Sequence, residues 1–267
     1  MPADLTSLLD DLAAESAVVG ALLDPLASAD WARPTPAVGW TIADQVTHLA
    51  YFDDVTLLSI TDPDQFRADA ETLAADGDDY PDQVAAAHRH LDGDTLRTWF
   101  RTSRQGLLDG YTRCDPGTRL PWFGPDMGVA SSVTARIMET WAHGQDIADT
   151  LGVERPPTAR LRHVAHIGIL ARPYSYLVNG LPLPTEPIRV ELTAPDGQTW
   201  TWGPAEAVDQ VTGPALDFCL AVTQRRHRSD TSLIVTGPVA TQWMTIAQAF
   251  AGPAGPGRPP RDGKVAP

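Results

Sequence analysis

The hydrophobic pattern of the chain changes its period near Pro182, and this change constrains the fold more than any other feature. Before it, apolar residues recur at three- and four-residue spacing, which is typical of amphipathic helices. After it, Ile188–Thr193 and Thr199–Trp202 alternate with period two on either side of a Pro-Asp-Gly turn, which predicts a β-hairpin. The sequence therefore predicts a mainly α-helical bundle followed by a small α+β part.

Capping and helix-breaking residues set the expected boundaries. Thr41 and Asp44 are typical of a capping box at the start of a helix, and Gly152 is a suitable C-cap. The acidic stretch 62–82 has an irregular pattern and predicts a loop with a short helix. We expect further helices over 5–26, 94–111, 131–151, 161–178 with an interruption near Pro173, 214–222 and 240–250, and a strand over 233–236.

These patterns predict two domains and a tail. The helical domain is expected over 1–180 and the small α+β domain over 183–251, and 252–267 is rich in Gly and Pro and is expected to be flexible. Cys114 and Cys219 lie far apart in the sequence, so they predict free thiols rather than a disulfide framework or a CxxC site.

Charge and hydropathy exclude several classes of partner. The formal net charge is -14 and no Lys/Arg-rich run is present, so the field of the protein would repel nucleic acids and anionic membrane surfaces. No stretch is apolar and long enough to span a bilayer, and the N-terminus has neither a basic start nor an apolar run. We therefore expect a cytoplasmic protein with no nucleic-acid or membrane partner.

Glu139 and His143 are four residues apart within an expected helix, so their side chains leave the same face one turn apart. That spacing allows a carboxylate oxygen and an imidazole nitrogen to bind one metal ion. His48, from a separate helix, could supply a third ligand. Two nitrogens and one carboxylate form an open catalytic set, in which a position remains for water or substrate.

Other residues compete with or support this site. His163 and His166 are three apart and are the second-choice ligand pair, but no acidic residue accompanies them. Asp146 could accept a hydrogen bond from His143 and orient its ring, or could be an ordinary helix contact. Three aromatic residues are candidates for the wall of a pocket or for plain core: Trp40, Tyr51 and Trp141.

The stretches GWTIADQVTHLAYFD (39–53) and METWAHGQDIAD (138–149) resemble the N-terminal domain of the mycothiol-dependent maleylpyruvate isomerases, a branch of the DinB-like four-helix metal enzymes. The resemblance implies a four-helix bundle whose metal ligands match His48, Glu139 and His143. It also implies that the C-terminal segment is a small domain related to sterol-carrier folds.

The same resemblance implies an enzyme that binds a divalent ion, with zinc first and nickel, iron or manganese as alternatives. The ion would activate a low-molecular-weight thiol such as mycothiol for isomerase or S-transferase chemistry on a small electrophilic substrate. An arginine of the C-terminal domain serves the family isomerase, and Arg225 and Arg226 stand in the comparable region. A positively charged helix end is the alternative interpretation of these arginines.

Two other functions remain open from the sequence. The chain could be a binding or regulatory protein with a structural metal and an apolar ligand in its small domain. It could also be a metal-dependent hydrolase or cyclase that uses activated water. We expect a monomer or a homodimer.

Overall fold

The computed structural model describes residues 4–75 and 79–261. The chain forms two compact units, Met1–Arg155 and Pro156–Pro267, and each is considered by itself. Helices α7 (Leu161–Leu170) and α8 (Arg172–Val178) belong to the second compact unit, although the sequence assigned them to the helical domain. The domain limits at 180 and 183 stay a prediction, and residues 262–267 of the expected tail lie outside the described residues.

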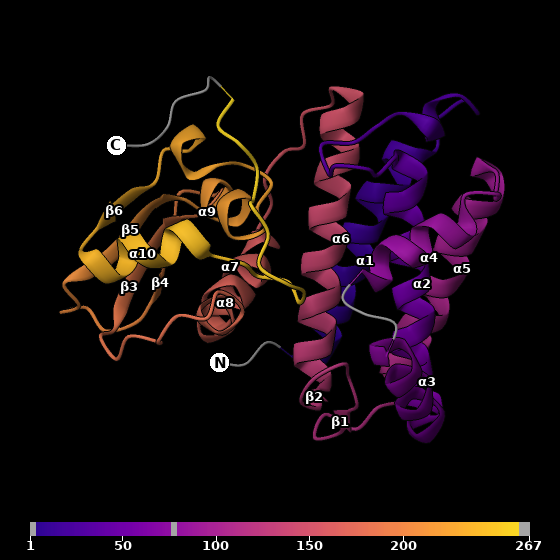
Figure 1. Cartoon of the computed structure of the whole chain (residues 1–267), viewed down its shortest axis with the longest axis horizontal. Coiled ribbons are helices and arrows are strands. Elements are labelled where there is room, and N and C mark those ends of the chain that lie inside the picture. Colours follow the sequence, from indigo (N-terminus) through magenta and orange to yellow (C-terminus); the bar gives the residue numbers. More distant parts are fainter. Residues whose placement is uncertain (1–3, 76–78, 262–267) are drawn as a thin grey trace. The chain divides into compact units, whose positions relative to one another are not determined.

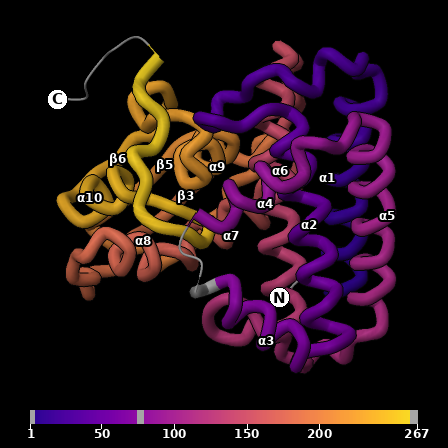
Figure 2. The backbone as a smooth tube through the Cα atoms, turned by 45° about the vertical axis from the view of Figure 1, so that its right-hand side comes forward, coloured from indigo at the N-terminus to yellow at the C-terminus, as the bar shows by residue number. Residues whose placement is uncertain are grey.

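The first unit is built on four long helices that run side by side (Figures 1 and 2). Each packs against two of the others, in the cyclic order α1, α6, α2, α5. Four helices in this arrangement enclose a common interior, which confirms the predicted bundle. Their bounds are α1 Leu5–Leu23, α2 Ile42–Thr61, α5 Gly93–Thr112 and α6 Val129–Leu151.

Local sequence explains where helix α2 begins and where helix α6 ends. Thr41 is the N-cap of α2, and its hydroxyl and the Asp44 carboxylate form the predicted capping box with the backbone amides of Asp44 and Thr41. Gly152 ends α6 in the left-handed conformation, with φ 69°, as its role of C-cap requires. These ends fix the register of α2 and α6, and the capping box typically contributes about 1 kcal/mol.

Aliphatic side chains fill the interior of the bundle. Leu12, Leu23, Leu49 and Ile137, one or two from each of α1, α2 and α6, are completely buried. Removing a side chain of this size from water stabilises a fold by roughly 1.5–3 kcal/mol. This packing holds α2 against α6, and it therefore determines which of their polar side chains can meet.

The stretch 62–82 is more helical than its composition suggested. It contains α3 (Pro63–Ala75) and the start of α4 (Tyr80–His88), so the expected loop with a short helix is wrong for the described residues. Asp62 accepts a hydrogen bond from the backbone amide of Gln65, Pro63 occupies the first helical position, and Phe66 is buried. Phe66 packs against the ring of Trp122 and anchors α3, whereas the acidic residues of this helix leave it without an apolar stripe in the sequence. The first unit also contains the short elements η1 Asp30–Ala32, β1 Arg119–Leu120 and β2 Met127–Gly128.

The second unit contains a four-stranded sheet in the order β4-β3-β5-β6. The hairpin of β3 and β4 is as expected, whereas the parallel pairing of β3 with β5 was missed because β5 carries only one large apolar side chain, Val211. Helix α10 ends before the predicted limit, since Ala247 is extended. The elements are β3 Ile188–Thr193, β4 Thr199–Trp202, β5 Asp209–Pro214, α9 Ala215–Val222, η2 Arg228–Asp230, β6 Ile234–Thr236 and α10 Pro238–Ile246.

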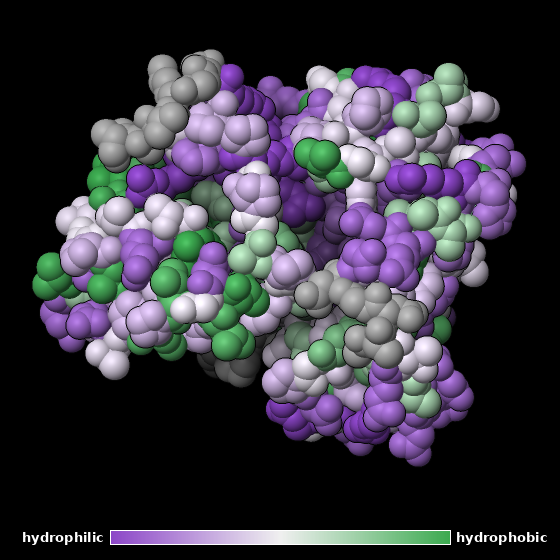
Figure 3. Space-filling view, in the orientation of Figure 1, coloured by the Kyte–Doolittle hydropathy of each residue, from purple (hydrophilic) through white to green (hydrophobic). Residues whose placement is uncertain are grey.

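The surface of the second unit carries exposed apolar side chains, among them Leu170, Leu177 and Leu183, and Figure 3 shows hydrophobic residues interspersed among its polar ones. A cavity of about 260 Å³ lies in this unit and is lined mainly by apolar side chains, with Arg172 as its only charged residue. Among the residues that the structure describes, no helix is both long and apolar enough to cross a membrane.

Candidate metal centre

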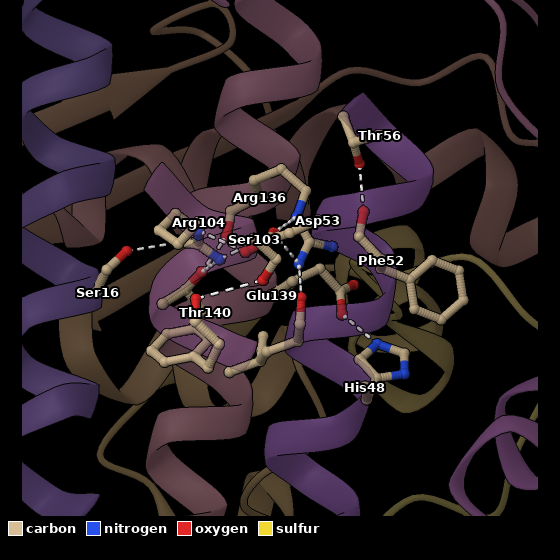
Figure 4. Close-up of polar contacts among 12 residues, drawn as sticks. Ser16, His48, Phe52, Asp53, Thr56, Ser103, Arg104, Arg136, Glu139 and Thr140 are labelled. Atoms are coloured by element: carbon tan, nitrogen blue, oxygen red, sulfur yellow. Dashed lines mark hydrogen bonds and ion pairs between the residues drawn. The ribbon is translucent and has the colours of Figure 1, made fainter. Parts of the chain in front are cut away.

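The three predicted ligands meet between α2 and α6. His48 Nε2 lies 3.2 Å from Glu139 Oε2, and His143 Nε2 lies 3.1 Å from the same oxygen. One ligand atom from each of the three residues lies within 4.8 Å of the others. Figure 4 shows His48 of α2 directed at Glu139 of α6. No second cluster of three possible metal-binding side chains occurs in residues 4–75 and 79–261.

The distances from the two histidine nitrogens to the Glu139 oxygen suit the binding of a metal ion. With zinc–nitrogen and zinc–oxygen bonds of about 2.0–2.2 Å, neighbouring ligand atoms of a tetrahedron are about 3.3 Å apart. The two nitrogen-to-oxygen distances at Glu139 are close to that value. The three side chains are 11–20% exposed, so they are shielded without being sealed off from solvent. The residues present therefore fit a divalent cation with an open position.

Electrostatics favour the forms of His48 and Glu139 that could bind a cation. The pKa of His48 is lowered to about 4, first by burial and then by the neighbouring His143, and the contact with Glu139 offsets only part of this shift. Burial raises the pKa of Glu139, but hydrogen bonds from His143 and His48 outweigh that effect and hold it well below its usual value. At neutral pH, His48 is thus neutral and Glu139 is ionised, as metal coordination requires.

One buried carboxylate behind the site pairs with two arginines, and sequence reasoning missed it. Asp53 of α2 accepts hydrogen bonds from Arg104 Nε at 2.7 Å and from Arg136 Nε at 3.1 Å. All three side chains are at most 4% exposed. Figure 4 shows Asp53 between the two arginines. The sequence contains a signal for the burial of Asp53. Its spacing continues the apolar stripe of Val46 and Leu49, so its side chain is expected to face the interior of the bundle.

This charge cluster connects directly to the backbone and side chains beside the ligands. Arg136 donates to the carbonyl of Leu49, the residue after His48. Arg104 donates to the hydroxyl of Thr140, the residue after Glu139. Two arginines and one aspartate carry a net charge of +1, which Glu139 balances in the absence of a cation. The cluster therefore holds α2, α5 and α6 in the arrangement that lets the ligands converge.

Aromatic rings surround the two histidines. Trp40 stacks on His143, with ring centroids 5.9 Å apart, and Phe52 lies 4.5 Å from His48. Tyr51 packs against Phe52. Trp40 thus lies beside the site as suggested from the sequence, whereas the ring contact of the buried Trp141 is with Arg155. Apolar walls of this kind lower the local dielectric and strengthen interactions of a bound ion.

The remaining candidates lie elsewhere. His163 and His166 are on α7 in the second unit, where His166 Nδ1 accepts a hydrogen bond from Trp202. Arg225 and Arg226 follow α9 and donate to the carbonyls of Thr223 and Arg225, respectively. A role of either arginine in catalysis stays a prediction.

Gln45 and the two cysteines also bear on the sequence predictions. Oε1 of Gln45 on α2 lies 2.5 Å from His143 Nδ1. The suggestion that Asp146 orients His143, or is an ordinary helix contact, stays a prediction. Cys114 and Cys219 are free thiols, as expected, and Cys219 is buried.

Comparison with known proteins adds to this geometry. Residues 12–148 match a family model described as the mycothiol maleylpyruvate isomerase N-terminal domain, and residues 184–235 match one described as wyosine base formation. Two uncharacterized proteins of Mycobacterium tuberculosis, from strains CDC 1551 / Oshkosh and ATCC 25618 / H37Rv, are each 47% identical over 256 residues, which is 96% of this chain and 100% of theirs.

Solved structures show the same fold. The crystal structure of a mycothiol-dependent maleylpyruvate isomerase superposes with a TM-score of 0.59 at 16% identity, over 87% of this chain and 93% of that chain. A variant of such an isomerase with one histidine replaced by alanine gives 0.61 at 15% identity with the same coverage. The resemblance inferred from residues 39–53 and 138–149 is thus confirmed. The chain belongs to the family of the mycothiol maleylpyruvate isomerase N-terminal domain.

Proposed function

We propose that this protein is a divalent-metal-dependent enzyme that activates mycothiol, or a similar low-molecular-weight thiol, for isomerase or S-transferase chemistry on a small electrophile. The observation that carries the proposal is the convergence of His48 and His143 on one oxygen of Glu139. Membership in the mycothiol maleylpyruvate isomerase family supports the choice of thiol.

The chain's own residues would hold the ion through two imidazole nitrogens and one carboxylate. Three protein ligands leave a position free for an exogenous ligand. A bound cation lowers the pKa of a coordinated thiol, so that the nucleophilic thiolate is present at neutral pH. The apolar surroundings formed by Trp40 and Phe52 would restrict water near that thiolate. Zinc suits this ligand set best, and nickel, iron and manganese are also compatible with it.

Arg225 and Arg226 are the candidates for binding an anionic group of the substrate or thiol, because a guanidinium binds a carboxylate through two hydrogen bonds. If either serves this role, Arg225→Gln or Arg226→Gln would raise the KM for a carboxylate-bearing substrate more than that for its amide. Equal effects on both substrates would exclude the role.

The test of thiol activation uses cobalt in place of the native ion. Metal-free protein is loaded with cobalt(II) and titrated with mycothiol, and thiolate coordination is followed by its ligand-to-metal charge-transfer absorption. The S-methylated thiol cannot form a thiolate and is the matched ligand control. His90→Ala is the matched protein control, because His90 is an exposed histidine of the first unit. We expect the band with the parent and His90→Ala, and its loss in His143→Ala.

The outcome separates the remaining functions. A protein that binds cobalt but gives no thiolate band with low-molecular-weight thiols would exclude thiol activation and favour a water-activating hydrolase or cyclase. A closed site without an exchangeable ligand would favour a structural metal, and the apolar cavity of the second unit would then be the place to seek a ligand. If thiol binds, product masses distinguish the reactions, since isomerisation leaves the thiol unconsumed and S-transfer adds it to the product.

A further inference from the structure

A chain of three hydrogen bonds runs from His143 to the loop before α2. His143 Nδ1 lies 2.5 Å from Gln45 Oε1, and Gln45 Nε2 donates to Thr35 Oγ1 at 2.9 Å. Thr35 Oγ1 donates in turn to the carbonyl of Trp40 at 2.9 Å. Gln45 is completely buried and His143 is buried as well. Few water molecules can therefore compete for these bonds.

The carbonyl of Trp40, at the end of this series of hydrogen bonds, sets the donor and acceptor of each bond before it. The Trp40 carbonyl can only accept, so the single hydroxyl proton of Thr35 is used there. Thr35 Oγ1 must then accept from the NH2 group of Gln45, which places the amide oxygen at His143. With the amide reversed, two acceptor oxygens would face each other at Thr35 and Trp40. An amide oxygen can only accept, and His143 Nδ1 therefore carries a proton.

The backbone around Thr35 makes this anchor rigid. Thr35 N donates to the carbonyl of Trp40, and Ile42 N donates to that of Arg33. Pro34 and Thr41 form an antiparallel bridge, so the loop is closed immediately before the capped start of α2. The ring of Trp40, at the end of the same loop, stacks on His143. The loop thus sets both the proton position and the plane of the imidazole.

The consequence concerns the other ring nitrogen. With a proton fixed on Nδ1, Nε2 of His143 can offer its lone pair to a cation. Without a cation, Nε2 lies 3.1 Å from the Glu139 carboxylate and bonds to it only when it also carries a proton. His48 differs, because its Nδ1 is buried and has no hydrogen-bond partner within the described part of the chain. Of the two histidines, only His143 has a side-chain acceptor at Nδ1 within the described part of the chain.

We propose that Gln45 and Thr35 are positioning residues that fix the Nδ1–H tautomer of His143 and so direct its Nε2 at the cation. The affinity part of this inference rests on the proposed metal site, because a cation between Nε2 and Glu139 leaves Nε2 unprotonated. The proton on Nδ1 follows from the contact with Gln45 and is expected without metal as well. Hydrogen bonds to the second nitrogen of a ligating histidine commonly contribute about 10- to 100-fold to metal affinity.

The first measurement is the imidazole nitrogen-15 spectrum of the full-length, metal-free protein. We expect Nδ1 of His143 to be protonated in the parent, whether or not Nε2 also carries a proton. In Gln45→Leu and Thr35→Val we expect Nδ1 to lose that proton in part or all of the molecules, because the acceptor at Nδ1 is removed or free to turn. Thr35→Ser keeps the hydroxyl and Gln45→Glu keeps the acceptor, so both should retain the proton on Nδ1. A parent His143 that carries its proton on Nε2 alone would overturn the proposal.

The second measurement is zinc affinity in competition with a chromophoric chelator. We expect Gln45→Leu to bind roughly 10- to 100-fold more weakly than the parent, with most of the affinity restored in Gln45→Glu. Gln105→Leu, which changes an exposed glutamine of α5, is the control and should match the parent. Affinity of Gln45→Leu equal to that of the control would overturn the positioning role. Absence of zinc binding in the parent would instead contradict the proposed function and leave the tautomer result standing.

Discussion

Nε2 of His48 lies 3.2 Å from Oε2 of Glu139, although 91 positions separate the two residues in the sequence. The contact is set by packing of α2 against α6 and by the buried cluster of Asp53, Arg104 and Arg136 behind it. The site is thus coupled to the stability of the bundle, and both can be tested by substitution.

The first prediction concerns Asp53. Asp53→Asn keeps the shape of the side chain but leaves two buried arginines with one fewer negative charge, which typically costs about 3–5 kcal/mol of the free energy of unfolding. Urea unfolding of the metal-free protein measures this cost. The neighbouring Asp54 is exposed and bonds to Trp99, so Asp54→Asn is the control and should cost about 1 kcal/mol or less. Equal losses in the two variants would contradict a structural role of the cluster.

The second prediction concerns pH. The pKa of His48 is about 4 in the folded protein, against 6.5 for an unperturbed histidine, so the unfolded chain binds the proton first. The free energy of unfolding of the metal-free protein should therefore fall as the pH decreases from about 6.5 to about 4, by up to roughly 3 kcal/mol. His48→Gln should flatten the decline in urea titrations across that interval, and His90→Gln should not. An unchanged decline in His48→Gln would rule out His48 as its source.

The third prediction concerns Gly144, which follows His143 on α6. A Cβ at this position would approach Cγ2 of Val19 on α1 to 2.8 Å. Gly144→Ala should therefore destabilise the protein by about 1–3 kcal/mol through overpacking, in spite of the better helix propensity of alanine. Gly20 of α1 has open space around it, and Gly20→Ala should stabilise by about 0.5–1 kcal/mol. Thermal unfolding compares the two, and the same sign in both would contradict the close packing of α1 and α6.

The fourth prediction concerns the source of the thiol. Burial raises the pKa of both the Cys114 and the Cys219 thiol, so neither is poised to act as a nucleophile. Simultaneous Cys114→Ser and Cys219→Ala substitutions should leave mycothiol-dependent turnover within about twofold of the parent. Loss of turnover in a folded double variant would show that the protein uses a thiol of its own. Alkylation by iodoacetamide provides a second check, since the buried Cys219 should react only after unfolding.

Sequence reasoning reached the features that rest on local chemistry. The capping box at Thr41, the end of α6 at Gly152 and the i, i+4 pair of Glu139 and His143 all depend on residues within a few positions of one another. The choice of His48 as a third ligand came from the family resemblance together with its place on a separate helix. The structure brings these three side chains together.

The contacts and the strand that the sequence did not predict depend on packing between distant parts of the chain. The partner of Gln45 is 98 positions away, and those of Asp53 are 51 and 83 positions away. A polar residue on an apolar helix face indicates burial, but it does not reveal which side chain it will meet. Strand β5 was missed for the same reason, because its pairing with β3 and β6 compensates for a weak local pattern.

The metal centre is tested most directly by elemental analysis of untagged protein, for the parent, His143→Ala and His90→Ala. We predict about one divalent ion per chain in the parent and in His90→Ala, and a loss of that ion in His143→Ala, because one of three ligands is removed. A folded parent that contains no metal, even after incubation with zinc, nickel, iron or manganese, would contradict the metal centre. His48, Glu139 and His143 would then form a buried hydrogen-bonded group and nothing more.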